Sequence, residues 1–328
     1  MTGNFDSSTT SDEVLAGLDV SGRRILITGA ASGLGFESAR ALASHGAAVT
    51  VLARSLERAN GAVAHLTDLV PEGQFESGGV DLADLSSIRS FTDAWLATHD
   101  AFDVLINNAG VMACPMGHTV DGFETQFGTN HLGHFLLTAR MAPGLLRGDA
   151  PRVVTLSSAG HSRSDVDLDD PNFEVTDYSP WNAYGRAKTA NALFARELAN
   201  RGGDLGLLSY SVHPGGIVTD LGRHLTDELI NEMVSFAKER SQGTDPESSS
   251  PGMKFKSVEA GAATEVWAAT SSDAELLAHN GAYLADCGLG VLGADPGQNG
   301  FLAHLLNDER AAGLWELSER MVGEAFAL

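Results

Sequence analysis

The chain has 328 residues, of which 43% are hydrophobic, and this is enough for one large α/β domain or two ordinary ones with a real core. Its formal net charge of −22 argues against nucleic-acid binding, because contact with the phosphate backbone needs a basic surface. Cys114 and Cys287 are too few for a disulfide framework, so we expect a reducing, cytoplasmic setting. No apolar run reaches the roughly 18 residues of a membrane span, and residues 1–21 do not look like a signal peptide.

Short apolar runs alternate with helical patterns along the chain. The runs are RILIT (24–28), AVTVLA (48–53), DVLIN (103–107), RVVTLS (152–157) and LLSYSV (207–212), and the alternation also requires a weaker strand near 74–80. Apolar strands separated by helices predict a parallel sheet buried on both faces. We therefore expect an α/β fold with one domain over residues 22–328, a doubly wound Rossmann-type sheet with helices on both faces, after a polar lead-in over residues 1–21.

A glycine-rich turn, TGAASGLG (28–35), follows the first strand and opens a helix. Gly29, Gly33 and Gly35 allow a tight turn and a close approach of the backbone, so that a pyrophosphate can lie at the helix N-terminus, beside Ser32 and Leu34. The spacing differs from the general dinucleotide fingerprint, and glycine-rich turns also end strands for structural reasons alone. The position between the first strand and a helix favours dinucleotide binding.

The end of the second strand indicates which dinucleotide is bound. An acidic residue there would bind the 2′-hydroxyl of NAD, whereas this strand ends in Ala53 and is followed by Arg54, with Arg58 one turn further on. A guanidinium at this point suits the 2′-phosphate of NADP. An ordinary surface arginine is the alternative, so the sequence favours NADP and leaves NAD possible.

The segment WNAYGRAKTAN (181–191) places Tyr184 and Lys188 one helical turn apart. An exposed helix face is the plain interpretation of such a pair. The alternative is a proton-transfer pair, because an ammonium on the same helix face favours the phenolate of a residue whose ordinary pKa is near 10. A serine hydroxyl at the end of a buried strand, such as Ser158, can bind a substrate oxygen on which charge develops. Ser157 beside it should point the opposite way if the strand continues.

These segments together resemble the short-chain dehydrogenase/reductase family over about residues 22–290. The motifs are TGAASGLG, NNAG (107–110), TNHLGHFLLT (129–138), TLSS (155–158), YGRAK (184–188) and HPGGIVTDLG (213–222), and DDPNFE and GAYLADC are similar to its retinol-dehydrogenase-like branch. The resemblance implies hydride transfer between a nicotinamide cofactor and an alcohol or carbonyl, with Tyr184 as general acid/base and Ser158 as the catalytic serine. It also implies that Lys188 holds the nicotinamide ribose and that Asn130 interrupts its helix and anchors a water in a proton relay.

The resemblance implies further cofactor contacts. They are Asp81 and Leu82 near the adenine, Asn108, Ala109 and Gly110 at the adenine ribose, and Pro214, Gly215, Ile217 and Thr219 at the nicotinamide carboxamide. Asp81 has an alternative role as a cap at the end of a strand. A substrate lid would follow over about residues 221–255.

The expected substrate is a hydrophobic alcohol, ketone or aldehyde, with a pocket lined by Met112, Leu221, Met233, Phe236 and Met253. Three alternatives remain. A dinucleotide-sensing module without turnover would normally lose the tyrosine or lysine, a sugar epimerase would favour another glycine spacing, and a C=C reductase of the protochlorophyllide-reductase type would need pocket cysteines, for which Cys114 is one candidate.

We expect no metal site, because His131 and His134 lack acidic or cysteine partners. We expect a homo-oligomer, a dimer or tetramer, formed through the helix that carries Tyr184 and Lys188. A C-terminal helical pattern in residues 299–323 should cover one edge of the domain.

Overall fold

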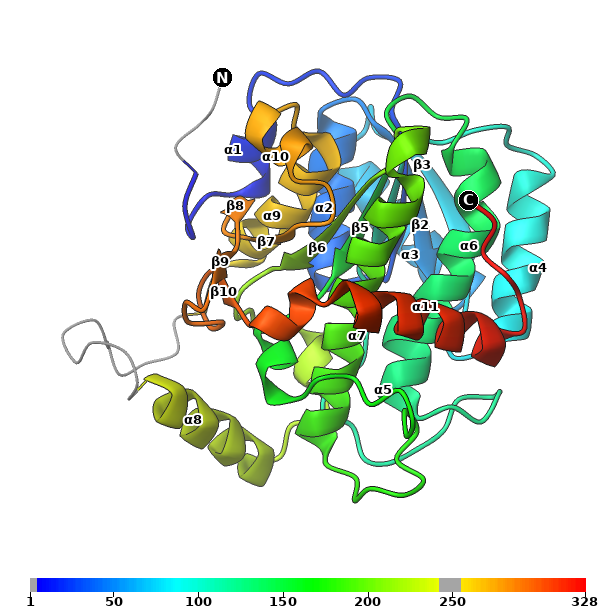
Figure 1. Cartoon of the computed structure of the whole chain (residues 1–328). Helices are drawn as coiled ribbons and strands as arrows, with labels where there is room; N and C mark the ends of the chain where they lie inside the picture. The colour runs from blue at the N-terminus through cyan, green and yellow to red at the C-terminus, as the bar shows by residue number, and fades with distance from the viewer. Residues whose placement is uncertain (1–4, 242–254) are drawn as a thin grey trace.

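The computed structural model describes residues 5–241 and 255–328. Within these residues, eight strands form one sheet in the order β3-β2-β1-β4-β5-β6-β7-β8 (Figure 1). Their bounds are β1 Arg24–Thr28, β2 Ala48–Ala53, β3 Gln74–Gly79, β4 Val104–Asn107, β5 Arg152–Leu156, β6 Leu208–His213, β7 Tyr283–Ala285 and β8 Gly288–Leu289. Every neighbouring pair is parallel except β7 and β8. The predicted α/β fold with a mostly parallel Rossmann-type sheet is confirmed.

Helices follow the strands along the chain and lie on both faces of the sheet (Figure 1). The α-helices are α1 Ser11–Leu15, α2 Gly33–Ser44, α3 Leu56–Leu69, α4 Leu85–Leu96, α5 Thr125–Phe127, α6 Gly133–Leu145, α7 Pro180–Gly202, α8 Asp227–Ser241, α9 Val258–Thr270, α10 Ala274–Ala278 and α11 Asp308–Val322. Shorter turns are the π-helical η1 Gly128–Leu132 and the 3₁₀ turns η2 Ala159–Arg163, η3 Gly203–Leu205, η4 Asp220–Gly222 and η5 Ala303–Leu306. The small pair β9 Val291–Leu292 and β10 Gly300–Phe301 lies outside the main sheet.

Two hydrophobic cores separate at the sheet because alternate residues of each strand face opposite sides. Ile25 and Ile27 of β1 pack in the core that α2, α3 and α9 cover. Leu26 between them packs in the core beneath α4, α6, α7 and α11. The continuous apolar runs of the sequence are therefore the strands of a sheet that is covered on both faces.

The N-terminal segment is packed against the domain. Thr10 and Glu13 form a capping box at the start of α1, in which each side chain binds the other's backbone N–H. Val14 and Leu15 are buried in the core with α2 and α9. The sequence predicted only a polar lead-in over residues 1–21. Residues 11–15 instead form a helix that is packed on the domain. This helix has no signal in the sequence because the single apolar pair Val14–Leu15 has no helical periodicity.

The C-terminal helix α11, predicted to cover one edge of the domain, crosses the outer side of α7 (Figure 1). Its Trp315 is 1% exposed and stacks on Phe326 at 4.8 Å between ring centroids. The same indole meets Phe135 edge-on and lies beneath the guanidinium of Arg201. The exposed residues that remain on α7 are Asn182, Asn200 and Arg201, so α7 itself offers little free surface to a second copy.

Candidate active site

Tyr184 and Lys188 share one face of α7. At the start of the helix the Oγ of Ser179 accepts the N–H of Asn182, and Pro180 occupies the first helical turn. Both features favour a helix start at this point. The Lys188 Nζ lies 5.7 Å from the centroid of the Tyr184 ring, and both residues are 4% exposed. The interpretation of this pair as an exposed helix face is therefore wrong.

Burial changes the acidity of both groups. It raises the pKa of Tyr184 to about 12, against which a hydrogen bond from Ser158 acts to lower it. Burial lowers the pKa of Lys188 to about 8. We expected Lys188 to lower the pKa of Tyr184. In this structure the desolvation of both side chains dominates, and the ammonium is directed at the Leu156 carbonyl, 2.8 Å away.

Ser158 lies directly after β5, at the carboxyl edge of the sheet. Its Oγ accepts the N–H of Gly160 at 3.0 Å, so the hydroxyl hydrogen is available to another acceptor. The Oγ of Ser157 donates to the Lys188 carbonyl of α7 at 2.8 Å, and the opposite orientation of the two serines stays a prediction. A Cβ on Gly160 would lie 2.7 Å from Cε1 of Tyr184, so only glycine lets the Ser158 loop lie against this ring.

Asn130 lies in the π-helical turn η1, which interrupts the helical segment as predicted. Its amide nitrogen donates to the Val111 carbonyl at 2.9 Å and its Oδ1 accepts the Val111 N–H at 2.8 Å. A methyl group on Gly110 would lie 3.2 Å from Oδ1 of Asn130 and 3.8 Å from Nζ of Lys188. The chain after β4, the π-turn and α7 therefore meet at one point.

The glycine turn has the shape expected of a phosphate cradle. Gly29 and Gly33 have φ values of +67° and +59°, which favour glycine, and a Cβ on Gly29 would lie 2.9 Å from the Ala109 Cα. Ser32 precedes α2 without a capping side-chain bond, which leaves N–H groups of the first turn available. A nicotinamide dinucleotide fits these residues, because its pyrophosphate would supply the missing acceptors.

Asn108 joins this turn to the end of β4. Its amide donates to the Thr28 carbonyl at 2.7 Å, and the backbone N–H groups of Asn108 and Ala109 both donate to Oγ1 of Thr28. A Cβ on Gly35 would lie 2.4 Å from the Asn108 amide nitrogen. The NNAG and TGAASGLG segments, far apart in the sequence, are thus in direct contact.

The predicted adenine end lies at the carboxyl ends of β2 and β3. Arg54 is exposed, and within residues 5–241 and 255–328 its guanidinium forms no hydrogen bond or ion pair. One carboxylate oxygen of Asp81 accepts the Ala83 N–H at 3.0 Å. Asp81 therefore caps the chain after β3, which is the alternative role considered for it. Leu82 is buried, and its carbonyl lies against Gly133 of α6.

The segment from Pro214 to Thr219 lies opposite the glycine turn. A Cβ on Gly33 would lie 3.5 Å from Thr219, and a Cβ on Gly261 of α9 would contact both Ile217 and Leu34. Gly215, with a φ of +96°, lies beneath the side chain of Lys256. The cofactor residues predicted before α2 and after β6 are therefore neighbours.

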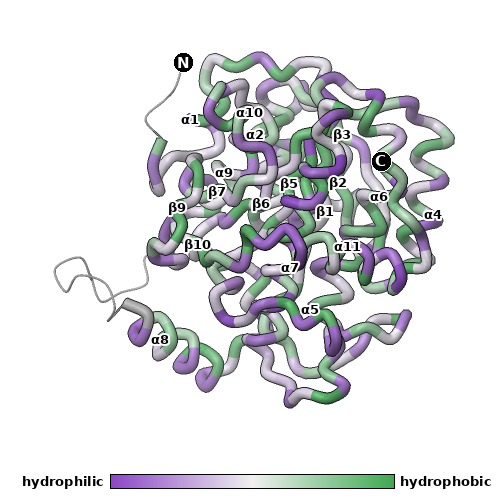
Figure 2. Tube along the Cα trace, viewed as in Figure 1, coloured by the Kyte–Doolittle hydropathy of each residue, from purple (hydrophilic) through white to green (hydrophobic). Residues whose placement is uncertain are grey.

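An apolar cluster covers Tyr184. It consists of Ala113, Trp181 and Tyr184 with Met112, Leu225, Leu229 and Met233 packed against them. The Trp181 Nε1 donates to the Leu229 carbonyl at 3.0 Å, which ties α8 to α7. Along α8 hydrophobic and hydrophilic residues alternate (Figure 2). This helix lies within residues 221–255, where a substrate lid is predicted, and residues 242–254 of that range lie outside the described chain.

The residues predicted to line a substrate pocket lie in different surroundings. Met112 and Met233 lie in the cluster, but Phe236 stacks on the guanidinium of Arg163 at 3.7 Å, and Leu221 belongs to η4 outside the cluster. Met253 lies outside the described residues. Trp181, Leu225 and Leu229 were not predicted from the sequence, although the spacing of four residues between Leu229 and Met233 indicates one apolar face of α8, with Leu225 just before the helix.

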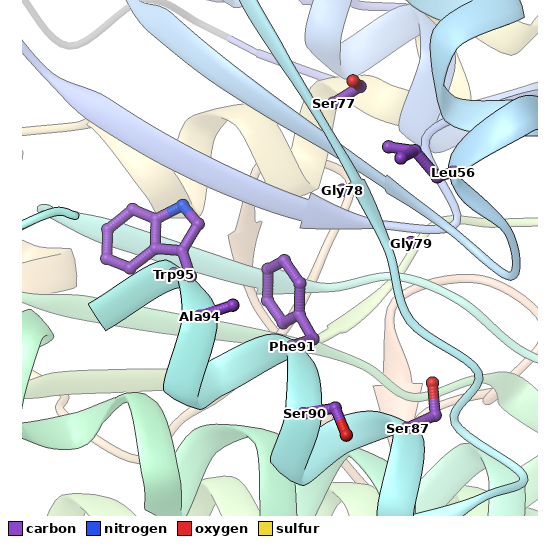
Figure 3. A pocket seen from close by; sticks show the side chains of 9 residues that line it. All are labelled: Leu56, Ser77, Gly78, Gly79, Ser87, Ser90, Phe91, Ala94 and Trp95. Atoms are coloured by element: carbon purple, nitrogen blue, oxygen red, sulfur yellow. The ribbon is translucent and has the colours of Figure 1, made fainter. Parts of the chain in front are cut away.

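Other features lie apart from this centre. A shallow hollow of about 440 Å³ lies between β3 and α4, where Phe91 and Trp95 face Gly78 and Gly79 (Figure 3), and none of the predicted site residues lines it. Burial raises the pKa of the Cys114 thiol, which does not favour a reactive thiolate. Within the described part of the chain, no cluster of His, Cys, Asp and Glu suits a metal ion, and no helix is both long and apolar enough to cross a membrane.

The sequence is similar to known proteins along most of its length. The family model described as short chain dehydrogenase matches residues 23–229. Short-chain dehydrogenase/reductase prx1 of Penicillium roqueforti is 39% identical over 308 residues, covering 90% of this chain and 84% of the relative. Human retinol dehydrogenase 14 is 37% identical over 320 residues, covering 92% and 87%.

Solved structures show the same fold. A putative uncharacterized protein from Mycobacterium paratuberculosis is 34% identical with a TM-score of 0.71, covering 94% of this chain and 97% of that one. A gluconate 5-dehydrogenase from Burkholderia cenocepacia, solved with NADP and tartrate, is 22% identical with a TM-score of 0.61, covering 81% and 94%, and shows the fold alone. The resemblance of the sequence motifs is confirmed: the chain belongs to the short-chain dehydrogenase/reductase family, whose members are oxidoreductases that use a nicotinamide cofactor.

Proposed function

We propose that this protein transfers a hydride between NADP and a hydrophobic alcohol or carbonyl compound, with Tyr184 as the general acid/base. The observation that carries the proposal is the convergence of Ser158, Tyr184 and Lys188 beneath an apolar cluster at the carboxyl edge of the sheet. Ligands of doubly wound sheets bind at this edge.

Residues of this chain carry out the proton transfer. The nicotinamide, when bound, accepts the hydride from the alcohol carbon or returns it to the carbonyl carbon. In carbonyl reduction Tyr184 donates its phenolic proton to the substrate oxygen, and its raised pKa keeps it protonated at neutral pH for that step. Ser158, whose Oγ already accepts the Gly160 N–H, donates its hydrogen to the same oxygen.

Asn130 and Lys188 are the neighbouring residues through which Tyr184 would regain its proton. The Asn130 side chain is fixed by two hydrogen bonds to Val111, and its amide keeps one N–H and one oxygen lone pair that can bind a relay water. The backbone carbonyl of Asn130 accepts the Nδ1–H of His134 at 2.8 Å, which holds this part of the π-turn in place. Lys188 is close enough to stabilise the phenolate that forms once the proton has left.

The cofactor preference rests on Arg54. Its exposed guanidinium at the end of β2 is free to bind a 2′-phosphate, and no carboxylate occupies the position that would bind a ribose hydroxyl. The gluconate 5-dehydrogenase with the same fold was solved with NADP. NAD remains the alternative that the assay decides.

The substrate class follows from the cluster over Tyr184. The surroundings of the phenol are Met112, Trp181, Leu229 and Met233, which favour an apolar substrate. One relative carries the name retinol dehydrogenase, an enzyme of an apolar alcohol, which supports the same class. A homo-oligomer stays part of the proposal, through faces other than the one that α11 covers on α7.

The test follows NADPH and NADH absorbance with a panel of apolar ketones, aldehydes and alcohols. Wild type and Tyr184→Phe, which removes only the hydroxyl, are compared for turnover and for cofactor affinity. We expect turnover with NADPH, a loss of roughly 100- to 10,000-fold in kcat in the variant, and unchanged cofactor binding.

Equal turnover in both proteins would contradict the role of Tyr184. Cofactor binding by the wild type without turnover on any compound would favour a dinucleotide-sensing module instead.

A further inference from the structure

His161 lies directly behind the proposed catalytic serine. It is fully buried in η2, three residues after Ser158. Its Nδ1 lies 2.7 Å from the Ser158 carbonyl oxygen, and its Nε2 lies 3.3 Å from the backbone nitrogen of Leu302. The imidazole therefore connects the Ser158 loop to the C-terminal segment between β10 and η5.

The two partners determine which ring nitrogen carries the hydrogen. A carbonyl oxygen only accepts, so Nδ1 donates to Ser158. The backbone N–H of Leu302 only donates, so Nε2 accepts. The ring is thus held as the neutral Nδ1–H tautomer. The hydroxyl of Tyr283 also approaches Nδ1, but at the longer distance of 3.4 Å.

The contact fixes the backbone on which Ser158 stands. The Ser158 carbonyl accepts the backbone N–H of His161 at 3.0 Å as well as the ring N–H, while its Oγ accepts the N–H of Gly160. Without the ring, the peptide after Ser158 would keep one of its two carbonyl bonds and would be freer to rotate. A rotation there would displace the hydroxyl from the Tyr184 side of the loop.

The packing around the ring supports this role. Tyr283 of β7 and His304 of η5 both meet the imidazole edge-on, at 5.2 Å and 5.9 Å between centroids. Thr189, next to Lys188 on α7, donates to the Ser164 carbonyl at 2.8 Å and lies 3.3 Å from that of His161. The loop is therefore held on one side by α7 and on the other by the imidazole.

We propose that His161 is a positioning residue for the reaction, because its Nδ1–H holds the Ser158 carbonyl and so directs the Ser158 hydroxyl at the substrate oxygen. This inference rests on the proposed function, since it acts through Ser158.

Two substitutions distinguish the contact of Nδ1 with Ser158 from the contact of Nε2 with Leu302. In His161→Asn the amide nitrogen can take the place of Nδ1 and donate to Ser158. In His161→Gln the longer amide can reach Leu302 but leaves the Ser158 carbonyl without its second donor. We expect His161→Asn to keep kcat within a few-fold of the wild type and His161→Gln to lose roughly 10- to 100-fold in kcat, with unchanged cofactor affinity. Tyr283→Phe, which keeps the packing, is the matched control and should leave kcat unchanged.

A double-mutant cycle shows whether His161 acts through Ser158. Ser158→Ala is combined with His161→Gln, and each protein is first checked for folding by thermal unfolding. We expect His161→Gln to cost little further activity once the serine hydroxyl is gone. The same fold-loss in both backgrounds would overturn the inference, as would equal losses in His161→Asn and His161→Gln.

The outcomes also separate this inference from the proposed function. Full activity of Ser158→Ala would overturn the inference and the role of Ser158, but not the proposed hydride transfer, which fails if the wild type shows no turnover. A large loss in Ser158→Ala with no effect of His161→Gln would overturn only the inference. Should His161→Gln not fold, His161→Leu, which has no donor for the Ser158 carbonyl, takes its place beside His161→Asn: a loss of kcat in His161→Leu alone supports the role, and equal kcat in the two variants contradicts it.

Discussion

The ammonium of Lys188 donates a hydrogen bond of 2.8 Å to the carbonyl of Leu156, the last residue of β5. Asn191, one turn further along α7, donates to the same oxygen at 3.0 Å. Ser158 follows Leu156 by two residues, so the end of one strand orients both the lysine and the serine. The buried ammonium is held by a neutral carbonyl, and burial alone accounts for its lowered pKa.

Substitution of Lys188 should separate stability from activity. Folding lowers the pKa of this group from 10.5 to about 8, so stability rises with pH across that window, and at pH 7 the folded protein bears the full cost of burying the charge. We expect Lys188→Met to abolish turnover but to raise the free energy of unfolding at pH 7 by about 1–3 kcal/mol. Urea unfolding at pH 7 and pH 10.5 measures this, and a gain that does not shrink at the higher pH would contradict the explanation.

Exchange of Arg54 should change the cofactor preference. Arg54→Asp removes the guanidinium that we assign to the 2′-phosphate and supplies a carboxylate for a ribose hydroxyl. We expect the ratio of kcat/KM for NADPH over NADH to fall by roughly 10- to 100-fold, as for the loss of a hydrogen bond to a charged group. Arg58→Asp, also exposed, is the control. Equal shifts in both variants would indicate a general charge effect instead.

Glu265, which lies away from the active site, should make the stability of the protein depend on pH. It is fully buried on α9, accepts a hydrogen bond from Ser38 of α2, and burial raises its pKa from 4.5 to about 7. Between pH 4.5 and about 7 the folded state therefore binds one more proton than the unfolded state. The stability contributed by protonated Glu265 is fully present below pH 4.5 and is lost as pH rises through 7.

We expect Glu265→Gln, which keeps an acceptor for Ser38, to be more stable than the wild type at pH 8 by on the order of 3 kcal/mol and to flatten the profile between pH 4.5 and 7. Unfolding in urea across this range measures both effects. Glu259→Gln on the exposed side of the same helix should leave the profile unchanged.

Trp315 should be the main anchor of the C-terminal helix. Its buried indole contacts Phe135, Phe194 and Phe326, and its removal leaves a large cavity over α7. We expect Trp315→Ala to lower the free energy of unfolding by about 3–5 kcal/mol. The exposed neighbour Glu316→Ala is the control, and a loss below about 1 kcal/mol in Trp315→Ala would mean that α11 contributes little to the fold.

The sequence by itself determined the features that depend on neighbours along the chain. Five apolar runs, with a sixth strand required by the alternation of strands and helices, predicted six parallel strands to within about a residue of their ends. The helical spacing of Tyr184 and Lys188 put both on one face. The glycine turn was predicted between β1 and α2, where it lies. Each of these follows from the period of a strand or helix or from the freedom of glycine, which are local properties of the backbone.

Only the tertiary structure decided what depends on contacts between distant segments. The short β7 and the helix α1 are too brief to give a periodic signal, and they form because a neighbouring strand and the packed helices α2 and α9 complete them. The bond of His161 to Leu302 joins residues 141 positions apart, and that of Ser38 to Glu265 joins residues 227 apart. The acidities of Tyr184 and Lys188 were set in the same way, because burial is a property of everything that packs around a side chain and not of its position in the chain.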